Sequence, residues 1–273
     1  MVIKIMKSPV IAILTDFGLS DGAVASMKAV ILSIHPGIQL MDISHDVSQF
    51  DIREGAFVLL RAHSYFPHGT IFLCVVDPGV GSSRLPIIAV TEKYSFVAPD
   101  NGLLSYVLAQ YDKIRIYHIS NPAYRLDKVS KTFHGRDIFA PAVAHLSVGA
   151  AVQEFGQEQG DIQSFKIRPA RIMQGGDIET ELLFGDHFGN GYSNIHEEEY
   201  RYSLTDGFYE LKLGDRALTG LFKKVNCYDD VEKGKGLLYF GSSGFLELAL
   251  REDSFMKTYP IKPGDRLMIS KVL

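Results

Sequence analysis

Two side chains of opposite charge, Asp77 and Arg84, stand seven residues apart in a loop that also contains Gly79 and Gly81. Asp77 directly follows the apolar run 70–76, which predicts a buried strand. A guanidinium beside a carboxylate fixes the direction of that carboxylate, so the pair could orient a reacting group in a partly dry pocket. A structural ion pair that pins the loop is the alternative, and the spacing by itself favours it.

A third titratable group, His134, lies in the polar segment 132–137, immediately before a segment, 138–146, whose apolar spacing predicts a helix. Histidine changes charge near neutral pH, so His134 could carry a proton during a reaction. The alternative is a capping or surface histidine beside Asp137, whose carboxylate would favour the positive N-terminus of the helix.

Asp16 also follows a predicted strand, the apolar run 10–14, and a glycine comes soon after it. A carboxylate in this place can accept hydrogen bonds from both hydroxyls of a ribose, while glycine lets a ligand approach the backbone. The alternative is that Asp16 and Asp21 form turns or cap the helix predicted from residue 23.

Two turns in the second half of the chain carry small polar groups that could bind a ligand. The first, 184–190, holds Asp186 and Asn190 beside aromatic residues, and the second, 241–247, holds Ser243. Plain β-turn chemistry would explain either turn alone. Together they offer acceptors for an ammonium group, small backbone donors and aromatic faces, which an amino-acid or purine site needs.

Several common catalytic patterns are missing from the sequence. No HExxH or paired Cys/His spacing predicts a metal site, and no GxSxG elbow predicts an acyl-transfer serine. The loop 79–84 imitates half of a dinucleotide fingerprint, but Arg84 replaces the third glycine, and the Lys-Ser/Thr ending of a phosphate-binding loop is lacking. We therefore expect no bound metal.

Strand-like and helix-like segments alternate through the first part of the chain, which predicts a layered α/β domain with a mainly parallel sheet. Around residue 168 the rhythm changes to short β-rich runs separated by glycine turns, which suggests a small barrel or sandwich. We predict an N-terminal α/β domain at 1–168 and a smaller C-terminal β-rich domain at 169–273. Asp16 and Asp77 would then lie at the carboxyl edge of the parallel strands, where ligands collect.

The composition indicates a soluble globular protein. The 273 residues carry 28 Lys and Arg against 32 Asp and Glu, and no basic arm, which argues against nucleic acid or a membrane surface as partner. No apolar stretch reaches the ~18 residues of a membrane span, and 1–7 is too interrupted for a secretion signal. With two distant cysteines, Cys74 and Cys227, we expect reduced thiols and a cytoplasmic location.

Taken in order, these segments resemble the family of S-adenosyl-L-methionine hydroxide adenosyltransferases, which are related to the halogenating enzymes fluorinase and chlorinase. Each motif is modest alone, but six in this order are specific, and they span nearly the whole chain. The six are Leu14-Thr15-Asp16-Phe17-Gly18, Val76-Asp77-Pro78-Gly79-Val80-Gly81, Ala98-Pro99-Asp100-Asn101-Gly102, Phe133-His134-Gly135-Arg136-Asp137, Asp186-His187-Phe188-Gly189-Asn190 and Ser242-Ser243-Gly244.

The resemblance implies an N-terminal α/β domain, a C-terminal β-barrel, and a homotrimer whose substrate lies between one subunit's N-terminal domain and a neighbour's C-terminal domain. The reaction it implies is hydrolysis of S-adenosyl-L-methionine by attack of water at C5′, which gives adenosine and L-methionine without a cofactor. A sulfonium is already a good leaving group, so the reaction needs an oriented water rather than an acid or a metal.

By the same resemblance, Asp77, Arg84 and His134 match the family's catalytic constellation, which orients and activates water. The halogenating relatives carry a tyrosine in place of Asp77 and lack His134, and the carboxylate in this chain would repel an incoming halide. Which group takes the proton from water stays open at this point.

Four further residues match substrate-binding positions of the family. Asp16 matches the ribose-binding aspartate. Asp186 and Asn190 match contacts to the methionine end and the adenine, and Ser243 matches a serine near the methionine carboxylate. Two alternatives stand beside the hydrolase: a halogenase, and a nucleoside-binding or sensing protein with little turnover. The broken glycine fingerprint disfavours an NAD-dependent oxidoreductase.

Overall fold

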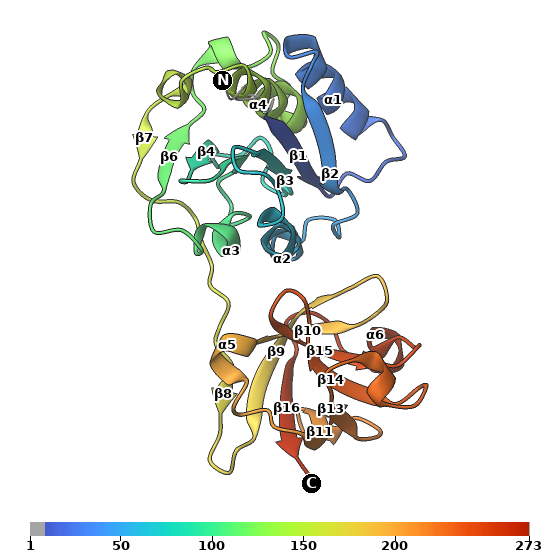
Figure 1. Cartoon of the computed structure of the whole chain (residues 1–273). Coiled ribbons are helices and arrows are strands. Elements are labelled where there is room, and N and C mark those ends of the chain that lie inside the picture. The colour runs from blue at the N-terminus through green and yellow to red at the C-terminus, as the bar shows by residue number, and fades with distance from the viewer. Residues whose placement is uncertain (1–8, 273) are drawn as a thin grey trace, which may run out of the picture. The chain divides into compact units, whose positions relative to one another are not determined.

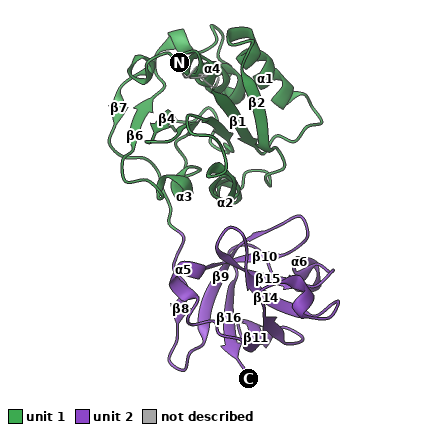
Figure 2. Ribbon diagram, in the orientation of Figure 1, with its two compact units in different colours: residues 1–166 green, residues 167–273 purple. Residues whose placement is uncertain are grey.

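The structure is a computed structural model that describes residues 9–272. The chain divides into two compact units, Met1–Lys166 and Ile167–Leu273, which Figure 2 shows in different colours. The first unit is a layered α/β fold and the second is a β-barrel, which confirms the predicted fold class (Figure 1). Within the described residues, no helix combines the length and the hydrophobicity that crossing a membrane requires.

The first unit is built on one sheet of seven strands. They are Val10–Thr15 (β1), Gln39–Ser44 (β2), Ile71–Val75 (β3), Pro86–Val90 (β4), Ser95–Pro99 (β5), Arg115–His118 (β6) and Glu158–Gln159 (β7). Their order is β2-β1-β3-β5-β4-β6-β7, and β1 pairs in parallel with β2 and β3, as β3 does with β5. Because β4 is antiparallel to both β5 and β6, strands β1, β2, β3, β5 and β6 all run in one direction.

Helices cover both faces of this sheet (Figure 1). Helices α1 (Ala23–Ile34) and α4 (Ala140–Ser147) pack on one face, and α2 (Ile52–His63) and α3 (Ser105–Leu108) pack on the other. Successive residues of β1 enter the two cores alternately, which explains why that strand is apolar throughout. Three short helices complete the unit: Pro122–Tyr124 (η1), the π-helix Gly135–Phe139 (η2) and Val152–Phe155 (η3).

The helix predicted from residue 23, whose helical apolar spacing runs to residue 34, has these bounds in the structure, because the spacing and the flanking turn residues agree there. The segment 103–110 also predicts a helix from its sequence, but only 105–108 are helical. The helix predicted at 138–146 is preceded by the π-helix, so regular α-helical structure begins at Ala140. This π-helix starts directly after His134, and π-helical turns are often found at functional sites.

The second unit contains the strands β8 to β16. They are Arg171–Ile172 (β8), Ile178–Gly185 (β9), Gly191–His196 (β10), Gly207–Leu213 (β11), Arg216–Ala217 (β12), Phe222–Lys224 (β13), Gly236–Phe240 (β14), Phe245–Leu250 (β15) and Arg266–Lys271 (β16). Seven of them form a closed ring in the order β9-β10-β15-β14-β13-β11-β16, which the pairing of β16 with β9 completes. β8 pairs with β9 and β12 with β11 outside this ring. Short helices lie at Glu197–Tyr200 (α5), Tyr228–Asp230 (η4) and Phe255–Thr258 (α6).

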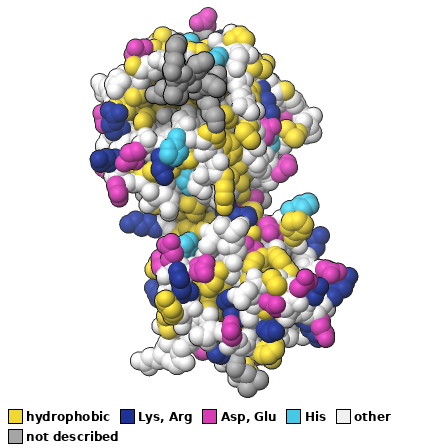
Figure 3. Space-filling model, in the orientation of Figure 1, with side chains coloured by type: hydrophobic (Ala, Val, Ile, Leu, Met, Phe, Trp, Pro, Cys, Tyr) yellow, Lys and Arg dark blue, Asp and Glu magenta, His cyan; other side chains and the backbone are white. Residues whose placement is uncertain are grey.

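Side chains alternate between the two faces of the barrel wall. Leu238, Leu246 and Leu248 belong to the main core of the barrel. Tyr239 and Glu247 alternate with them along β14 and β15, so they lie on the opposite face of the same strands. On the face that Figure 3 shows, acidic and basic side chains are interspersed over both units.

Candidate active site

Asp77, Arg84 and His134 meet just beyond the carboxyl end of β3. Arg84 donates from Nε to the two carboxylate oxygens of Asp77, at 3.1 and 3.0 Å, and from Nη2 to Oδ2 of the same carboxylate. Its Nη2 also lies 2.8 Å from Nδ1 of His134. The side chains of Asp77 and Arg84 are only 4% and 6% exposed, and the guanidinium packs 5.2 Å from the ring centre of Phe139. One guanidinium therefore orients two potential catalytic groups.

The imidazole of His134 is held in its neutral form. Burial lowers its pKa below the usual 6.5, and the positive charge of Arg84 lowers it further, against the opposite effects of Asp77 and Asp137. A guanidinium can only donate, so Nδ1 of His134 must accept, and the ring proton of the neutral imidazole is then on Nε2. His134 consequently offers an N–H donor to whatever occupies the site.

The loop that carries Arg84 is fixed at both ends. Asn101 donates from Nδ2 to the backbone oxygen of Val76 at 2.8 Å, which holds the end of the strand before Asp77. Gly81 has a φ of +79°, and a Cβ at this position would lie 2.5 Å from the backbone oxygen of Lys131. The Arg84 loop therefore lies directly against the segment that leads into His134, and only glycine fits at this contact.

Asp137 supports the segment around His134 and is completely buried. Its carboxylate accepts from Nε of Arg136 at 2.7 Å and from the backbone N–H of Ser130 at 2.8 Å. Burial raises the pKa of Asp137, but these hydrogen bonds outweigh it and hold the pKa below its usual value. Asp137 thus ties the preceding loop to the π-helix, which is a structural role.

Asp16 lies at the carboxyl end of β1 and has an unsatisfied oxygen. Its Oδ2 accepts from the backbone N–H of Phe50 at 2.9 Å, whereas its Oδ1 is buried and has no hydrogen-bond partner among the described residues. A buried acceptor without a donor is costly, so this atom fits a ligand hydroxyl. The neighbouring Phe17 and Phe133 form an edge-to-face pair with ring centres 5.8 Å apart, which joins the Asp16 loop to the His134 segment.

The turn alternative applies to Asp21, and the N-cap position of α1 is occupied by Gly22. Oδ1 of Asp21 accepts from the backbone N–H of Ala23 at 2.9 Å, at the start of α1. Asp16 makes no such contact with this helix within the part of the chain that the structure describes.

Asp186 and Asn190 lie together in the tight turn between β9 and β10. Oδ1 of Asp186 accepts from the backbone N–H of Asn190 at 2.9 Å, and its Oδ2 accepts from Nδ2 of Asn190 at 3.2 Å. The same Nδ2 also donates to the hydroxyl of Tyr228 at 3.1 Å. The predicted pair is therefore a real hydrogen-bonded unit, and it continues into residues that the sequence did not single out.

Sequence reasoning missed the three residues to which Asn190 is connected. The hydroxyl of Tyr228 hydrogen-bonds to that of Tyr239, which in turn hydrogen-bonds to Oε2 of Glu247. The tyrosines look like ordinary barrel aromatics in sequence. Glu247 was the available signal, because it is the one charged residue in the apolar strand 245–250 and it is only 4% exposed.

Ser243 lies in the turn between β14 and β15, which is closed by the backbone bond from Gly244 N–H to the oxygen of Gly241, at 2.9 Å. The hydroxyl oxygen of Ser243 is buried and has no hydrogen-bond partner among the described residues. Like Oδ1 of Asp16, it is a polar atom suited to a ligand group.

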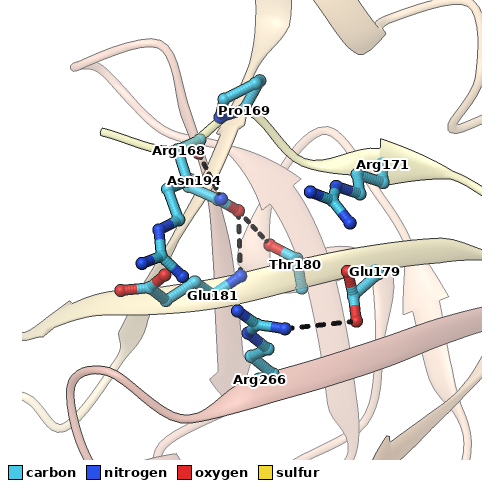
Figure 4. Close-up of a pocket in the computed structure, with 8 residues that line it drawn as sticks. All are labelled: Arg168, Pro169, Arg171, Glu179, Thr180, Glu181, Asn194 and Arg266. Atoms are coloured by element: carbon cyan, nitrogen blue, oxygen red, sulfur yellow. Dashed lines mark hydrogen bonds and ion pairs between the residues drawn. The ribbon is translucent and has the colours of Figure 1, made fainter. Parts of the chain in front are cut away.

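Two cavities of the second unit differ in their lining. One, of about 460 Å³, is lined by Phe188, Asn190, Tyr228, Leu250, Glu252, Asp253 and Ser254. The other, of about 310 Å³ (Figure 4), holds three arginines and two glutamates and none of the predicted site residues; its lining is Arg168, Pro169, Arg171, Glu179, Thr180, Glu181, Asn194 and Arg266. The first cavity therefore coincides with a predicted binding residue. Across residues 9–272, no three His, Cys, Asp or Glu side chains are grouped as metal ligands.

Residues 11–156 match the N-terminal domain of the SAM hydroxide adenosyltransferase family, and residues 180–268 match its C-terminal domain. The chain belongs to this family. The two matched segments lie one in each structural unit, and all seven predicted site residues fall inside them.

Members of the family with assigned names include hydrolases and halogenases. The chain is 33% identical to the (R)-S-adenosyl-L-methionine hydrolase of Thermus thermophilus, over 92% of this chain and 95% of that protein. It is 27% identical to a fluorinase of Actinoplanes, over 97% and 98% of the two chains. A solved structure from Thermotoga maritima, described as an uncharacterized conserved protein, matches with a TM-score of 0.89 and 35% identity over 96% of this chain and all of that one.

Proposed function

We propose that this protein hydrolyses (R)-S-adenosyl-L-methionine to adenosine and L-methionine. The observation that carries this proposal is the buried contact of one guanidinium, that of Arg84, with both Asp77 and His134. The full-length similarity to proteins named (R)-S-adenosyl-L-methionine hydrolase supplies the substrate and its sulfonium epimer.

The reaction is a displacement at C5′ of the ribose. The oxygen of water forms a bond to C5′ while the bond between C5′ and the sulfonium sulfur breaks, and the electron pair of that bond neutralises the sulfur. L-Methionine leaves as a thioether, and the new 5′ oxygen loses one proton to become the hydroxyl of adenosine. Positioning of the two reactants can supply roughly 7–11 kcal/mol of the barrier, so an oriented water is the main requirement.

Asp77 and His134 divide the orientation of that water between them. His134 is neutral and presents an N–H on Nε2, so it donates to the water oxygen rather than taking its proton. Asp77 keeps acceptor positions on both carboxylate oxygens beyond those that Arg84 uses, and it accepts the water proton or the hydrogen bond from it. Arg84 acts through these two groups and positions them.

Four further residues bind the parts of S-adenosyl-L-methionine that do not react, namely its ribose, its adenine and its methionine end. Asp16 presents its unpartnered Oδ1 to the ribose hydroxyls, and Ser243 presents its unpartnered hydroxyl to the methionine carboxylate. Asp186 and Asn190 contact the methionine end and the adenine. The proposal includes neither metal nor cofactor, because the sulfonium leaves as a neutral thioether and needs no Lewis acid. We also place the protein in the cytoplasm.

A fluorinase-like halogenation is the second candidate, because fluorinases are also full-length relatives. The buried carboxylate of Asp77 argues against it, since a negative charge beside the reacting carbon repels a halide ion. A nucleoside-binding protein with little turnover is the third candidate, and it would give the contacts of Arg84 with Asp77 and with His134 no catalytic role.

The test is product identification by chromatography after incubation with each sulfonium epimer, with and without fluoride or chloride, and after dialysis against a chelator. We expect adenosine and methionine in equal amounts from the (R) epimer under all these conditions. A 5′-halogenated adenosine would establish the halogenase, and tight adenosine binding without products would establish the binding protein. Loss of activity on chelation, restored by a metal ion, would contradict the metal-free mechanism.

We propose further that the protein is a homotrimer whose active site combines Asp77 of one subunit with Asp186 of a neighbour. Light scattering should then give the mass of three 30.3 kDa chains. Asp77→Asn and Asp186→Ala variants, inactive alone, should regain about a quarter of wild-type activity when equal amounts assemble together, because subunits combine at random. No recovery from purified mixed assemblies would show that each site belongs to a single chain.

A further inference from the structure

The hydrogen-bonded chain from Asn190 to Glu247 is set up by the register of the barrel. Tyr239 on β14 and Glu247 on β15 are directly paired across the two strands, so their side chains are neighbours on one face. Tyr228 comes from the short helix η4 after β13 and reaches Tyr239, with ring centres 4.9 Å apart. Asn190 closes the chain from the turn before β10. Four separate segments therefore contribute one side chain each.

A carboxylate at one end gives this chain a direction. The Glu247 carboxylate can only accept, so Tyr239 donates to it and has its own oxygen left as an acceptor. Tyr228 must then donate to Tyr239, and its oxygen can only accept from Nδ2 of Asn190. Burial, together with the bond to Glu247, raises the pKa of Tyr239, which keeps this hydroxyl protonated.

The carboxylate of Asp186 orients the Asn190 amide in the same direction as the tyrosines do. Oδ2 of Asp186 accepts from Nδ2 of Asn190 at 3.2 Å, so both partners of the amide, Asp186 and Tyr228, accept a hydrogen bond from its nitrogen. Among the described residues, the side-chain oxygen of Asn190 accepts no hydrogen bond. Asn190 and Tyr228 both line the cavity of about 460 Å³, together with the exposed ring of Phe188. The amide is thereby fixed with its oxygen as the atom left for a ligand.

We propose that Glu247, Tyr239 and Tyr228 form a specificity relay, which orients the Asn190 amide so that its oxygen selects a purine with a 6-amino group over one with a 6-oxo group. The inference rests on the proposed function, in which Asn190 contacts the adenine. An amino group donates to this oxygen, whereas an oxo group would bring two acceptors together. Sites built to hydrogen-bond a substrate group reject analogues that lack it, because buried polar atoms stay unpaired.

The test compares kcat/KM for S-adenosyl-L-methionine and its 6-oxo analogue, S-inosyl-L-methionine, in the wild type and in Tyr228→Phe, Tyr239→Phe and Glu247→Gln. Each phenylalanine removes only a hydroxyl and breaks the relay, which leaves Asp186 alone to orient the amide through its 3.2 Å bond, so the adenosyl-to-inosyl ratio should fall by about three- to tenfold, the value of one hydrogen bond. Glu247→Gln can donate to Tyr239 and reverse the chain, so it should lower the ratio at least as much.

Tyr209→Phe is the matched control. Tyr209 is also a buried tyrosine of the barrel, but its hydroxyl donates to the backbone oxygen of Thr205 at 2.7 Å, outside the relay. The ratio of kcat/KM for the adenosyl and inosyl substrates in Tyr209→Phe should equal that of the wild type. An unchanged ratio in the three relay variants, or an equal fall in Tyr209→Phe, would overturn the relay. Dissociation constants for adenosine and inosine, measured in the same variants, give the same comparison if the wild type proves to have no hydrolase activity.

Discussion

Nη2 of Arg84 lies 2.8 Å from Nδ1 of His134, which sets the tautomer of the imidazole, while burial and then the charge of Arg84 lower its pKa and favour the neutral form. A protonated His134 would lose this bond and would place two positive groups side by side. The neutral ring keeps the bond and directs its Nε2 proton away from Arg84, so the proposed orientation of water depends on the protonation state of His134.

The pH profile of kcat/KM should therefore fall on its acid side, because His134 becomes protonated there. Its pKa is held below 6.5 in the folded protein, first by burial and then by Arg84, so the neutral form is present above that pH. We expect kcat/KM to be level near pH 7 and to fall as the pH drops through the lowered pKa. The folding free energy contributed by this shift follows the same sign: it is present above pH 6.5 and is lost on acidification.

His134→Asn provides the check on that assignment. An asparagine oxygen can take the place of Nδ1 as acceptor for Arg84 but does not titrate. The variant should keep part of the activity and lose the acid limb in a pH profile of kcat/KM. A limb that persists in the variant, or a wild-type limb centred above pH 6.5, would assign the titration to another group.

Asp77→Asn should lower kcat by about 10²–10⁴-fold, the usual contribution of a positioned acid or base, with a small effect on KM. The amide keeps the size of the side chain but accepts only through one oxygen and carries no charge. Steady-state kinetics measure kcat and KM separately, and circular dichroism confirms that the variant is folded. Asp46→Asn, an exposed carboxylate of the same unit, serves as the control and should behave as wild type.

The same buried pair should also be visible in stability. Because the side chains of Asp77 and Arg84 are almost inaccessible, Arg84→Met leaves a buried carboxylate without its partner, which costs about 3–5 kcal/mol. Asp77→Leu should cost a similar amount by stranding the guanidinium. Urea denaturation of the double variant should show a loss clearly smaller than the sum of the two. Additive losses would mean that the two charges do not stabilise each other.

Gly81→Ala tests the contact between the Arg84 loop and the segment before His134. The new methyl group would lie 2.5 Å from the backbone oxygen of Lys131, at a φ of +79°. Gly149 also has a positive φ, +98°, but a Cβ there would meet nothing within 4 Å. Gly149→Ala should therefore lose about 1 kcal/mol of stability and keep its activity, whereas Gly81→Ala should lose more stability and most of its kcat. Equal effects on kcat would disprove the positional role of this contact.

The strands and helices with strong periodicity could be predicted from sequence, and the irregular ones could not. α1 has the predicted bounds because its apolar spacing lies between two signals for the ends of a helix, Gly22 before it and the His-Pro-Gly sequence 35–37 after it. The strand Gly191–His196 was missed, because its polar sequence reads as a continuation of the preceding glycine turn, and only the barrel around it buries these residues. The π-helix before α4 leaves no periodic signal, since it depends on tertiary packing around Gly135.

In the candidate site, too, some contacts could be predicted from sequence and others could not. Both interpretations of the short loop, catalytic and structural, predicted a contact of Asp77 with Arg84, and the structure has it as a buried pair. The contact of Arg84 with His134 joins residues 50 positions apart, which spacing does not predict, and it came to attention only through the resemblance to a family. The relay residue Glu247 was visible as a charge in an apolar strand, but its partners Tyr228 and Tyr239 become identifiable only once the barrel register is known.

Ser243→Ala separates ligand binding from folding. The Ser243 hydroxyl is buried without a partner, so its removal should leave the free energy of unfolding unchanged or slightly higher. A hydroxyl that binds the methionine carboxylate makes a charge-assisted bond, whose loss should raise KM at least about tenfold and leave kcat and adenosine binding nearly unaltered.

Ser193→Ala is the control, in which a hydroxyl with a structural role is removed, because the fully buried Ser193 donates to the backbone oxygen of Leu246 at 3.1 Å. That variant should lose about 1 kcal/mol of stability at constant KM. If Ser243→Ala loses stability and keeps its KM, the hydroxyl serves the turn, and the methionine carboxylate must be held elsewhere.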